Sequence, residues 1–199
     1  VIGGSGYFDG SGDYLKVSPD QTVGANAFTF ECWYYCTGAF GSVYTLFGND
    51  STGTGNISIR VNSSTQISID RYNVAANNFT VPTLASNAWN HIVAVRDGSN
   101  NETVFVNGVR SSTGVVTDSY SYGFFSTVGY ENPTYTQYCQ GYITDARAVI
   151  GSAVYSPSST TISVPTSPLT AVTNTKLLLN MTNAGIPDSA MMNDLETVG

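Results

Sequence analysis

Alternation of apolar and polar residues is the main structural signal along this chain. Runs in which every second residue is apolar recur from one end to the other, separated by short stretches of Gly, Asn, Ser and Thr. A period of two is typical of strands that bury one face. The runs that predict strands most clearly cover residues 28–36, 56–61, 66–70, 89–97, 102–106, 122–129, 141–151 and 175–181. No segment has a convincing helical period.

Turn signals join several of these runs into hairpins. The sequence NSST lies between the runs 56–61 and 66–70. Asn107-Gly108 predicts a two-residue hairpin, because a type I′ turn needs positive φ at both central positions. About a dozen short strands without helices predict an all-β fold, in which two antiparallel sheets pack face to face.

The length of 199 residues fits a single domain, 1–199. Residues 156–175 are rich in Ser, Thr and Pro and form either a linker or an ordered loop across the sandwich edge. We expect the ordered loop, because a strand signal follows directly. Residues 176–199 are expected to return as C-terminal strands. The sequence begins without Met, so we expect a processed or partial chain that continues beyond both printed ends.

Charge, hydropathy and cysteine spacing limit the partners and the cellular setting that this chain can have. Only 11% of residues are charged and the net charge is −7, without clusters of Lys or Arg, so nucleic acid is not expected as a partner. No apolar run reaches 18 residues, which predicts no membrane span.

Cys32 and Cys36 lie roughly 13 Å apart on an extended strand, too far for a disulfide. Cys139 could meet either one, but we expect three reduced thiols and assembly in a reducing cytoplasm.

Five blocks resemble concanavalin A-like lectin/glucanase domains of the laminin-G-like type, and they occur in the family order. They are GYFDGSGDYLKV (6–17), FTFECWYY (28–35), WNHIVAVRD (89–97), VFVNGV (104–109) and GYITDARAVIGSAVY (141–155). The resemblance implies a two-sheet jelly roll. It also implies that the last strand, near DLETVG, returns beside the first, near GYFDG.

The C-terminal part resembles a signature that such domains carry in tailed bacteriophages. It comprises PTSPLTAVTNTKLLLN (165–180) and GIPDSAMMNDLETVG (185–199). In those relatives the domain belongs to virion structural proteins, such as tail fibres, appendages and capsid decorations. The resemblance therefore implies location in a virion, contact with other virion proteins, and a homo-oligomer or a repeated lattice site.

Three aspartates are candidate ligands for a structural calcium ion. Simple alternation places Ile143, Asp145 and Arg147 on one strand face. In similar domains an acidic residue at the position of Asp145 binds Ca²⁺ or holds the N-terminal turn, here the turn with Asp9 and Asp13. Carboxylates from distant turns would suit Ca²⁺, which prefers several oxygen ligands. The alternative is an Asp–Arg pair with backbone hydrogen bonds and no ion or other cofactor.

Catalytic patterns are missing from the sequence. Glucanases of this superfamily carry Glu-x-Asp-x-Glu on one strand, which sets nucleophile and acid about 5–5.5 Å apart. Of the four glutamates, Glu31, Glu102, Glu131 and Glu196, only Glu196 has an acidic residue two positions away, Asp194, and the full Glu-x-Asp-x-Glu pattern is absent. The single histidine, His91, shares a strand face with Trp89 and Val93, as a packed histidine does. We therefore expect no enzyme.

A Tyr-dense segment, 118–142, is the candidate contact surface. Such residues suit sugar stacking or protein contact, or they fill sheet faces and rims. The candidates are Tyr120, Tyr122, Tyr130, Asn132, Tyr135 and Tyr138.

The sequence thus predicts a non-enzymatic virion structural domain of a tailed phage, which acts through subunit contact and adhesion to a host surface glycan. The first alternative is a carbohydrate-binding module of a secreted, extracellular bacterial protein. The second is a glycoside hydrolase with an unrecognised site.

Overall fold

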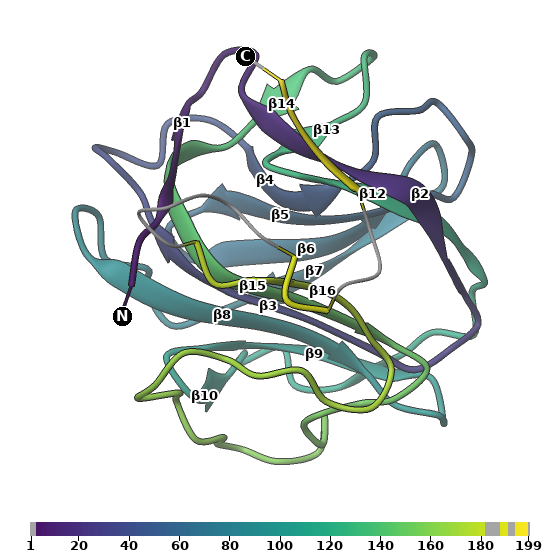
Figure 1. The fold of residues 1–199 in the computed structure, drawn as a ribbon. Helices are drawn as coiled ribbons and strands as arrows, with labels where there is room; N and C mark the ends of the chain where they lie inside the picture. Colours follow the sequence, from purple (N-terminus) through teal and green to yellow (C-terminus); the bar gives the residue numbers. More distant parts are fainter. Residues whose placement is uncertain (1–2, 182–187, 191–193, 199) are drawn as a thin grey trace.

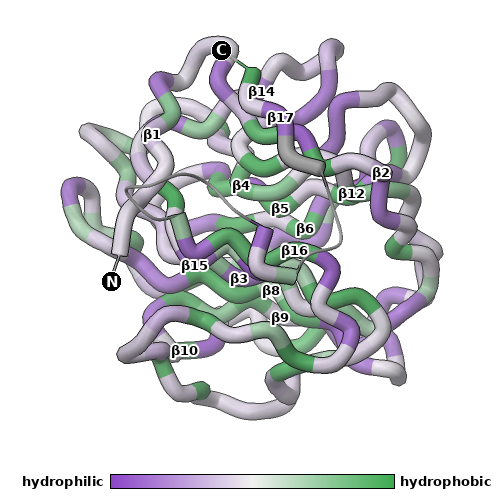
Figure 2. The backbone as a smooth tube through the Cα atoms, viewed as in Figure 1, coloured by the Kyte–Doolittle hydropathy of each residue, from purple (hydrophilic) through white to green (hydrophobic). Residues whose placement is uncertain are grey.

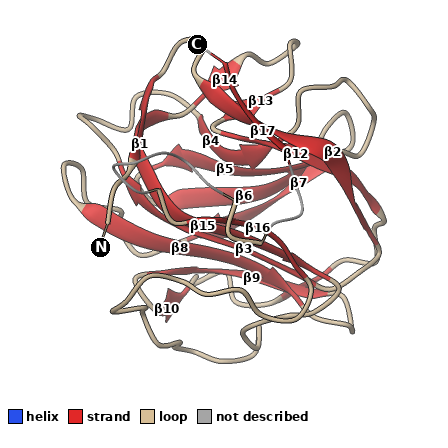
Figure 3. Cartoon of the chain, viewed as in Figure 1, coloured by secondary structure: helices blue, strands red, loops and turns tan. Residues whose placement is uncertain are grey.

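The computed structural model describes residues 3–181, 188–190 and 194–198. These residues form strands, turns and loops without any helix (Figure 3). Two large antiparallel sheets pack against each other (Figure 1), so the all-β sandwich prediction is confirmed. Within the described ranges no helix is long and apolar enough to cross a membrane.

The first sheet has eight strands, in the order β1–β15–β3–β8–β9–β10, with β16 also paired to β15 and β11 to β9. Their bounds are β1 Gly6–Asp9, β3 Phe28–Tyr35, β8 Trp89–Arg96, β9 Asn101–Val106, β10 Val109–Arg110, β11 Val116–Thr117, β15 Gln140–Ile150 and β16 Thr175–Leu179.

The second sheet has seven strands, in the order β17–β2–β12–β4–β5–β6–β7. Their bounds are β2 Tyr14–Gly24, β4 Tyr44–Gly48, β5 Ile57–Ser63, β6 Gln66–Arg71, β7 Ala75–Thr80, β12 Tyr122–Val128 and β17 Asp194–Val198. A separate short hairpin pairs β13 (Tyr130–Glu131) with β14 (Gln137–Tyr138).

The hydrophobic core lies between the two sheets. Alternate residues of β3 point into it, as the sequence pattern predicts, and their side chains are at most 1% exposed. The ring of Phe30 contacts Phe47 and Phe125 of the opposite sheet at centroid distances of 5.3 and 5.2 Å. Figure 2 shows hydrophobic positions repeating along the strands, with hydrophilic ones between them and in many loops. All three cysteines are free thiols and are buried.

The local hairpin predictions are confirmed. β5 pairs with β6 through the NSST turn, and β9 pairs with β10 around Asn107-Gly108. Asn107 has φ 49° and Gly108 has φ 81°, the positive values that a type I′ turn requires. A Cβ on Gly108 would lie 2.7 Å from the carbonyl oxygen of Ile162, so this turn also needs glycine for close packing.

The expected alternation along residues 141–151 is wrong at one point. The pairing of β15 with β3 shifts between Thr144 and Arg147, and Asp145 has φ 49°. This is a β-bulge, in which one extra residue reverses the faces that follow. Ile143 and Ala146 consequently both belong to the core, while Arg147 lies opposite Glu31 on the outer face.

The bulge yields a first prediction. Asp145→Ala should lower the free energy of unfolding by about 1–2 kcal/mol, because alanine disfavours positive φ and cannot accept the 2.8 Å hydrogen bond from Asn180. Asp145→Gly should cost less than Asp145→Ala, since glycine adopts this conformation freely. Urea denaturation of both variants measures the difference. An alanine variant more stable than the glycine variant would indicate a regular strand without a bulge.

The C-terminal strand returns to a different partner from the one expected. β17 pairs with β2, placing Asp194 opposite Ser18 and Val198 opposite Tyr14. β1 belongs to the other sheet and pairs with β15. The prediction that DLETVG lies beside GYFDG is therefore wrong in its pairing, although both strands border the same pocket. Residues 182–187, 191–193 and 199 of the predicted returning segment lie outside the described residues.

Residues 151–175 form a loop over part of the outer face of the first sheet. Val93, Val95 and Phe105 are fully buried there, and Tyr155 and Ile162 of the loop pack against them. The loop also hydrogen-bonds to the sheet, from Val154 N to Thr29 Oγ1 (2.9 Å) and from Ile162 N to Gly108 O (2.8 Å). The Ser/Thr/Pro-rich segment therefore lies over a sheet face, where the sequence suggested a loop across the sandwich edge.

Candidate functional site

The β13–β14 hairpin lies against the outer face of the second sheet. Asn132 N donates to Asn49 O (2.7 Å), and Tyr72 Oη donates to Thr134 Oγ1 (3.0 Å). Gly48 of β4 is packed so tightly that a Cβ there would lie 2.2 Å from Tyr130 O. The hairpin therefore covers the polar side chains of β4, β5 and β6 beneath it.

A buried charged cluster lies under this hairpin. Arg60 of β5 contacts Asp70 of β6 (Nη2–Oδ1, 2.8 Å) and Glu131 of β13 (Nη1–Oε2, 3.3 Å). The Glu131 side chain is fully buried, and its Oε1 has no hydrogen-bond partner among the described residues. Burial, with help from the Asp70 carboxylate and against the Arg60 charge, raises the pKa of Glu131 to about 7. Burial likewise raises the pKa of Asp70 despite Arg60.

Three of the six predicted contact residues are buried supports. Tyr122 is 2% exposed and donates to Glu102 Oε1 (2.7 Å). The Tyr130 ring stacks on another ring at each side, with both centroid distances 4.7 Å. Asn132 is fully buried, and its Oδ1 accepts from two backbone amides of its own loop. These three side chains hold the loop in place and cannot reach a partner at the surface.

The other three are more accessible, to different extents. Tyr120 is partly buried under Arg71, whose guanidinium carbon lies 4.9 Å from the ring centroid. Tyr138 is partly buried in the stack on Tyr130. Tyr135 is 40% exposed and rests edge-on against Tyr72. Only Tyr135 of the six exposes a large part of its ring.

The three candidate calcium ligands are not assembled. Asp9 and Asp13 share one turn, where Asp13 Oδ2 accepts from Asp9 N (3.2 Å) and Asp9 Oδ1 accepts from Ser11 N (2.6 Å). Asp145 lies beyond the other end of β1, because Asp9 pairs with Gln140 and Gly6 with Ile143. Among residues 3–181, 188–190 and 194–198, no group of three His, Cys, Asp or Glu side chains could hold a metal. The expected grouping is wrong for this reason.

We predict that calcium does not change stability. The carboxylates of Asp9, Asp13 and Asp145 already accept hydrogen bonds from protein groups, so they gain little from an ion. Differential scanning fluorimetry in millimolar Ca²⁺ and in EDTA should give the same melting temperature. A melting temperature that is higher in Ca²⁺ than in EDTA, with the difference lost in Asp13→Asn, would overturn this expectation.

Arg147 belongs to a second buried network, on the outer face of the first sheet. It hydrogen-bonds Glu31 Oε1 (Nε–Oε1, 2.8 Å) and donates to Thr170 O (2.7 Å). Glu31 Oε2 also contacts His91 Nε2 (3.3 Å) and accepts from Tyr155 Oη (2.9 Å). The expected Asp145–Arg147 pair is therefore wrong, whereas His91 is packed as predicted. The network joins the sheet to the covering loop.

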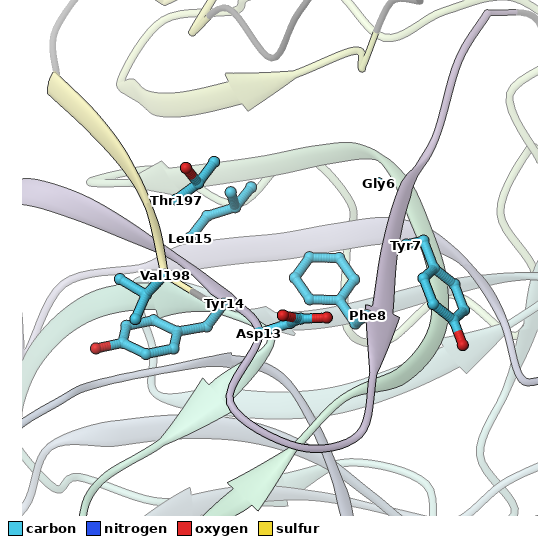
Figure 4. Close-up of a pocket in the computed structure, with 8 residues that line it drawn as sticks. All are labelled: Gly6, Tyr7, Phe8, Asp13, Tyr14, Leu15, Thr197 and Val198. Atoms are coloured by element: carbon cyan, nitrogen blue, oxygen red, sulfur yellow. The ribbon is translucent and has the colours of Figure 1, made fainter.

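A pocket of about 350 Å³ lies where the two sheets separate, between β1, β2 and β17. Figure 4 shows that Phe8 points toward this space, whereas Tyr7 projects from the opposite side of β1. The carboxylate of Asp13 also faces the space. Asp13 is the one acidic residue among the residues that line this pocket, so the lining offers no pair of carboxyl groups.

Comparison with known sequences gives the family. A sequence profile described as the concanavalin A-like lectin/glucanases superfamily matches residues 9–151. The chain belongs to this superfamily. A search of curated protein sequences finds no match. The C-terminal segments 165–180 and 185–199 lie wholly outside the matched range.

Solved structures share the superfamily fold. A Bacteroides ovatus protein, described as a candidate carbohydrate-binding protein, is 14% identical with a TM-score of 0.64, over 97% of this chain and 59% of its own. Domains LG4-5 of the mouse laminin alpha1 chain are 15% identical with a TM-score of 0.57, over 78% and 45%. The Ruminococcus gnavus IT-sialidase CBM40, bound to alpha2,3 sialyllactose, is 11% identical with a TM-score of 0.50, over 70% and 87%. At these identities the likeness concerns the fold alone.

The charged cluster differs from the catalytic arrangement of superfamily glucanases. Those enzymes present nucleophile and acid from one strand into an accessible site. Here Asp70 and Glu131 come from different elements, Arg60 contacts both, and the hairpin covers Glu131. A substrate would have to displace the hairpin to reach this carboxyl group. The cluster is arranged to attach the hairpin to the sheet.

Proposed function

We propose that this domain binds carbohydrate without cleaving it. One observation carries the non-enzymatic part. Glu31, Glu102 and Glu131 are fully buried, and the remaining glutamate, Glu196, lies exposed on the edge strand β17. Glycoside hydrolysis of the usual kind needs two carboxyl groups on either side of the scissile bond. No accessible pair of glutamates exists within the described residues, and the Glu-x-Asp-x-Glu pattern of superfamily glucanases is absent from the sequence.

The carbohydrate part is supported by the fold. The matched superfamily includes lectins by its description. Two of the structural neighbours are described by their carbohydrate binding. A jelly-roll sandwich presents rigid strands and loops on which a sugar can be held in one orientation.

The test is a paired assay on the purified protein. A panel of neutral and acidic polysaccharides is scored for retention of the protein in affinity gels and for release of reducing ends. We expect retention by at least one polysaccharide and no release. Release that is lost in Asp70→Asn or Glu131→Gln would overturn the non-enzymatic proposal, and no retention by any polysaccharide would overturn the binding proposal.

For the biological setting we propose a tailed-phage virion. The support is the C-terminal resemblance at 165–180 and 185–199, together with three buried, reduced cysteines. In that setting the domain serves as a fibre, appendage or capsid decoration that contacts other virion proteins and displays its glycan-binding face. Capsid or tail genes beside its gene are the expected finding. A secretion operon without virion genes would favour the extracellular carbohydrate-binding module.

A further inference from the structure

Four aromatic side chains form a continuous row across the outer face of the first sheet. Tyr7 of β1 pairs with Tyr142 of β15, Tyr142 pairs with Tyr35 of β3, and Tyr35 pairs with Trp89 of β8. Successive ring centroids are 5.0, 5.9 and 5.5 Å apart. These four residues are here named the aromatic row. Their strands lie side by side at one end of the sheet in Figure 1.

The backbone holds the row in register. Gly141, next to Tyr142, has φ 126°, and a Cβ there would lie 2.0 Å from Tyr35 O. Only glycine allows β15 to approach β3 this closely. The chain neighbours Phe8, Ile143 and Tyr34 point inward and are at most 3% exposed, which directs the row outward.

The aromatic row is left open by the rest of the chain. The loop of residues 151–175 covers the other part of this face, around Phe105 and Glu31. Tyr7 is 57% exposed, and the other three aromatic side chains are partly exposed. Among the described residues, none of the three phenol groups and no indole N–H has a hydrogen-bond partner. Large rings with unused polar groups suit a partner that brings both apolar surface and hydroxyl groups.

A pocket adjoins the row and adds polar groups. It has a volume of about 380 Å³ and is lined by Ser5, Tyr35, Thr37, Asn87, Trp89 and Tyr142. Asn87 is fixed by its backbone, since its N–H donates to Cys36 O (2.9 Å), and its Oδ1 accepts from Gly38 N (3.2 Å). Its amide nitrogen has no hydrogen-bond partner among the described residues. None of the six lining residues is charged.

These properties identify the class of ligand. An aromatic floor with a few hydroxyl and amide groups matches the alternating C–H faces and hydroxyls of a sugar ring. The uncharged lining, on a chain of net charge −7, disfavours an anionic polymer. A stable protein interface needs about 20–30 residues on each side, whereas this site has the row and its few pocket residues. The long row on four strands suits an oligosaccharide better than a single sugar.

We propose that the aromatic row and its pocket bind a neutral oligosaccharide segment of a polysaccharide, with sugar rings stacked on Trp89, Tyr35 and Tyr142. Asn87 and Thr37 hydrogen-bond the sugar hydroxyls. This inference rests on the proposed carbohydrate-binding function and names its site.

The experiment uses affinity gels that contain laminarin, xyloglucan, galactomannan or starch, with dextran sulfate as the anionic comparison. Trp89→Ala and Tyr142→Ala should each weaken binding to the retained neutral polysaccharide at least about tenfold, the usual effect of removing a central aromatic contact. Phe124→Ala removes an exposed ring from β12 of the second sheet and is the control, with unchanged affinity. If either variant fails to fold, Tyr7→Ala replaces it, because Tyr7 is the most exposed residue of the aromatic row. Its removal should likewise weaken binding.

The outcomes separate the site from the function. Retention of wild type with equal retention of Trp89→Ala and Tyr142→Ala would overturn the site while the proposed function stands. No retention of wild type in any gel would overturn the function itself. Retention in dextran sulfate alone would overturn the neutral class of ligand. A wild-type dimer in light scattering that Trp89→Ala converts to a monomer, without glycan binding, would make the row a subunit contact instead.

Discussion

Glu31→Gln is expected to lower the free energy of unfolding by about 3–5 kcal/mol, because it breaks a buried ion pair and leaves Arg147 without its carboxylate. Glu31 is fully buried and binds Arg147, His91 and Tyr155. Burial alone would raise its pKa, but the His91 hydrogen bond and the Arg147 charge hold the pKa of Glu31 below its ordinary value. The ionised carboxylate therefore stabilises the fold above that ordinary pKa, and this stabilisation is lost in acid, as the pH falls through the lowered pKa.

Guanidinium denaturation at neutral pH measures the change, and Glu196→Gln on the exposed edge strand is the matched control, with an effect near zero. Hydrogen exchange gives a second readout. Faster exchange in residues 151–175 of the Glu31→Gln variant is expected, because Tyr155 and Thr170 join that loop to the network. A loss below about 1 kcal/mol would match a solvent-exposed ion pair and would contradict the buried network.

Glu131→Gln is expected to flatten the pH dependence of stability between about pH 5 and 8. Burial raises the pKa of Glu131 to about 7 from an ordinary 4.5, so between these values the folded protein binds more protons than the unfolded chain. Stability due to this group therefore falls as the pH rises through that window. The shift corresponds to about 3 kcal/mol at most. A glutamine at this position does not ionise. The free energy of unfolding of the variant, relative to that of wild type, should therefore increase by about 2–3 kcal/mol between pH 5 and pH 8.

Urea denaturation at pH 5, 6, 7 and 8 measures how the free energy of unfolding changes with pH in wild type and in Glu131→Gln. The lowered pKa values of Glu31, Asp50 and Asp118 act at more acidic pH and should affect wild type and variant alike. If the free energy of unfolding changed with pH equally in the two proteins, Glu131 would be exposed to solvent. In that case the hairpin would not cover the cluster with Arg60.

Local signals in the sequence predicted much of the fold. The strand periods and the Asn107-Gly108 turn are properties of neighbouring residues, and both were predicted correctly. The bulge at Asp145 was missed because no local feature marks it, and its hydrogen-bond partner, Asn180, lies far along the chain. Because of the same bulge, Arg147 lies opposite Glu31 and forms its ion pair with Glu31 instead of the predicted pair with Asp145.

The candidate surface was harder to predict for a topological reason. Tyrosines clustered in sequence became buried supports, with Tyr122 in the core and Tyr130 in the β13–β14 hairpin. The aromatic row instead combines residues from positions 7, 35, 89 and 142, which meet only through the strand order β1–β15–β3–β8. Outward positions in each run could be predicted, but the register between distant strands could not.

The most direct measurement is size-exclusion chromatography with light scattering of the protein incubated with its best-retained polysaccharide. It reports binding and polymer length together. We predict that the protein elutes with the polysaccharide and that the polymer keeps its molar mass after prolonged incubation. Separate elution, or a falling molar mass of the polymer, would contradict a domain that binds carbohydrate without cleaving it.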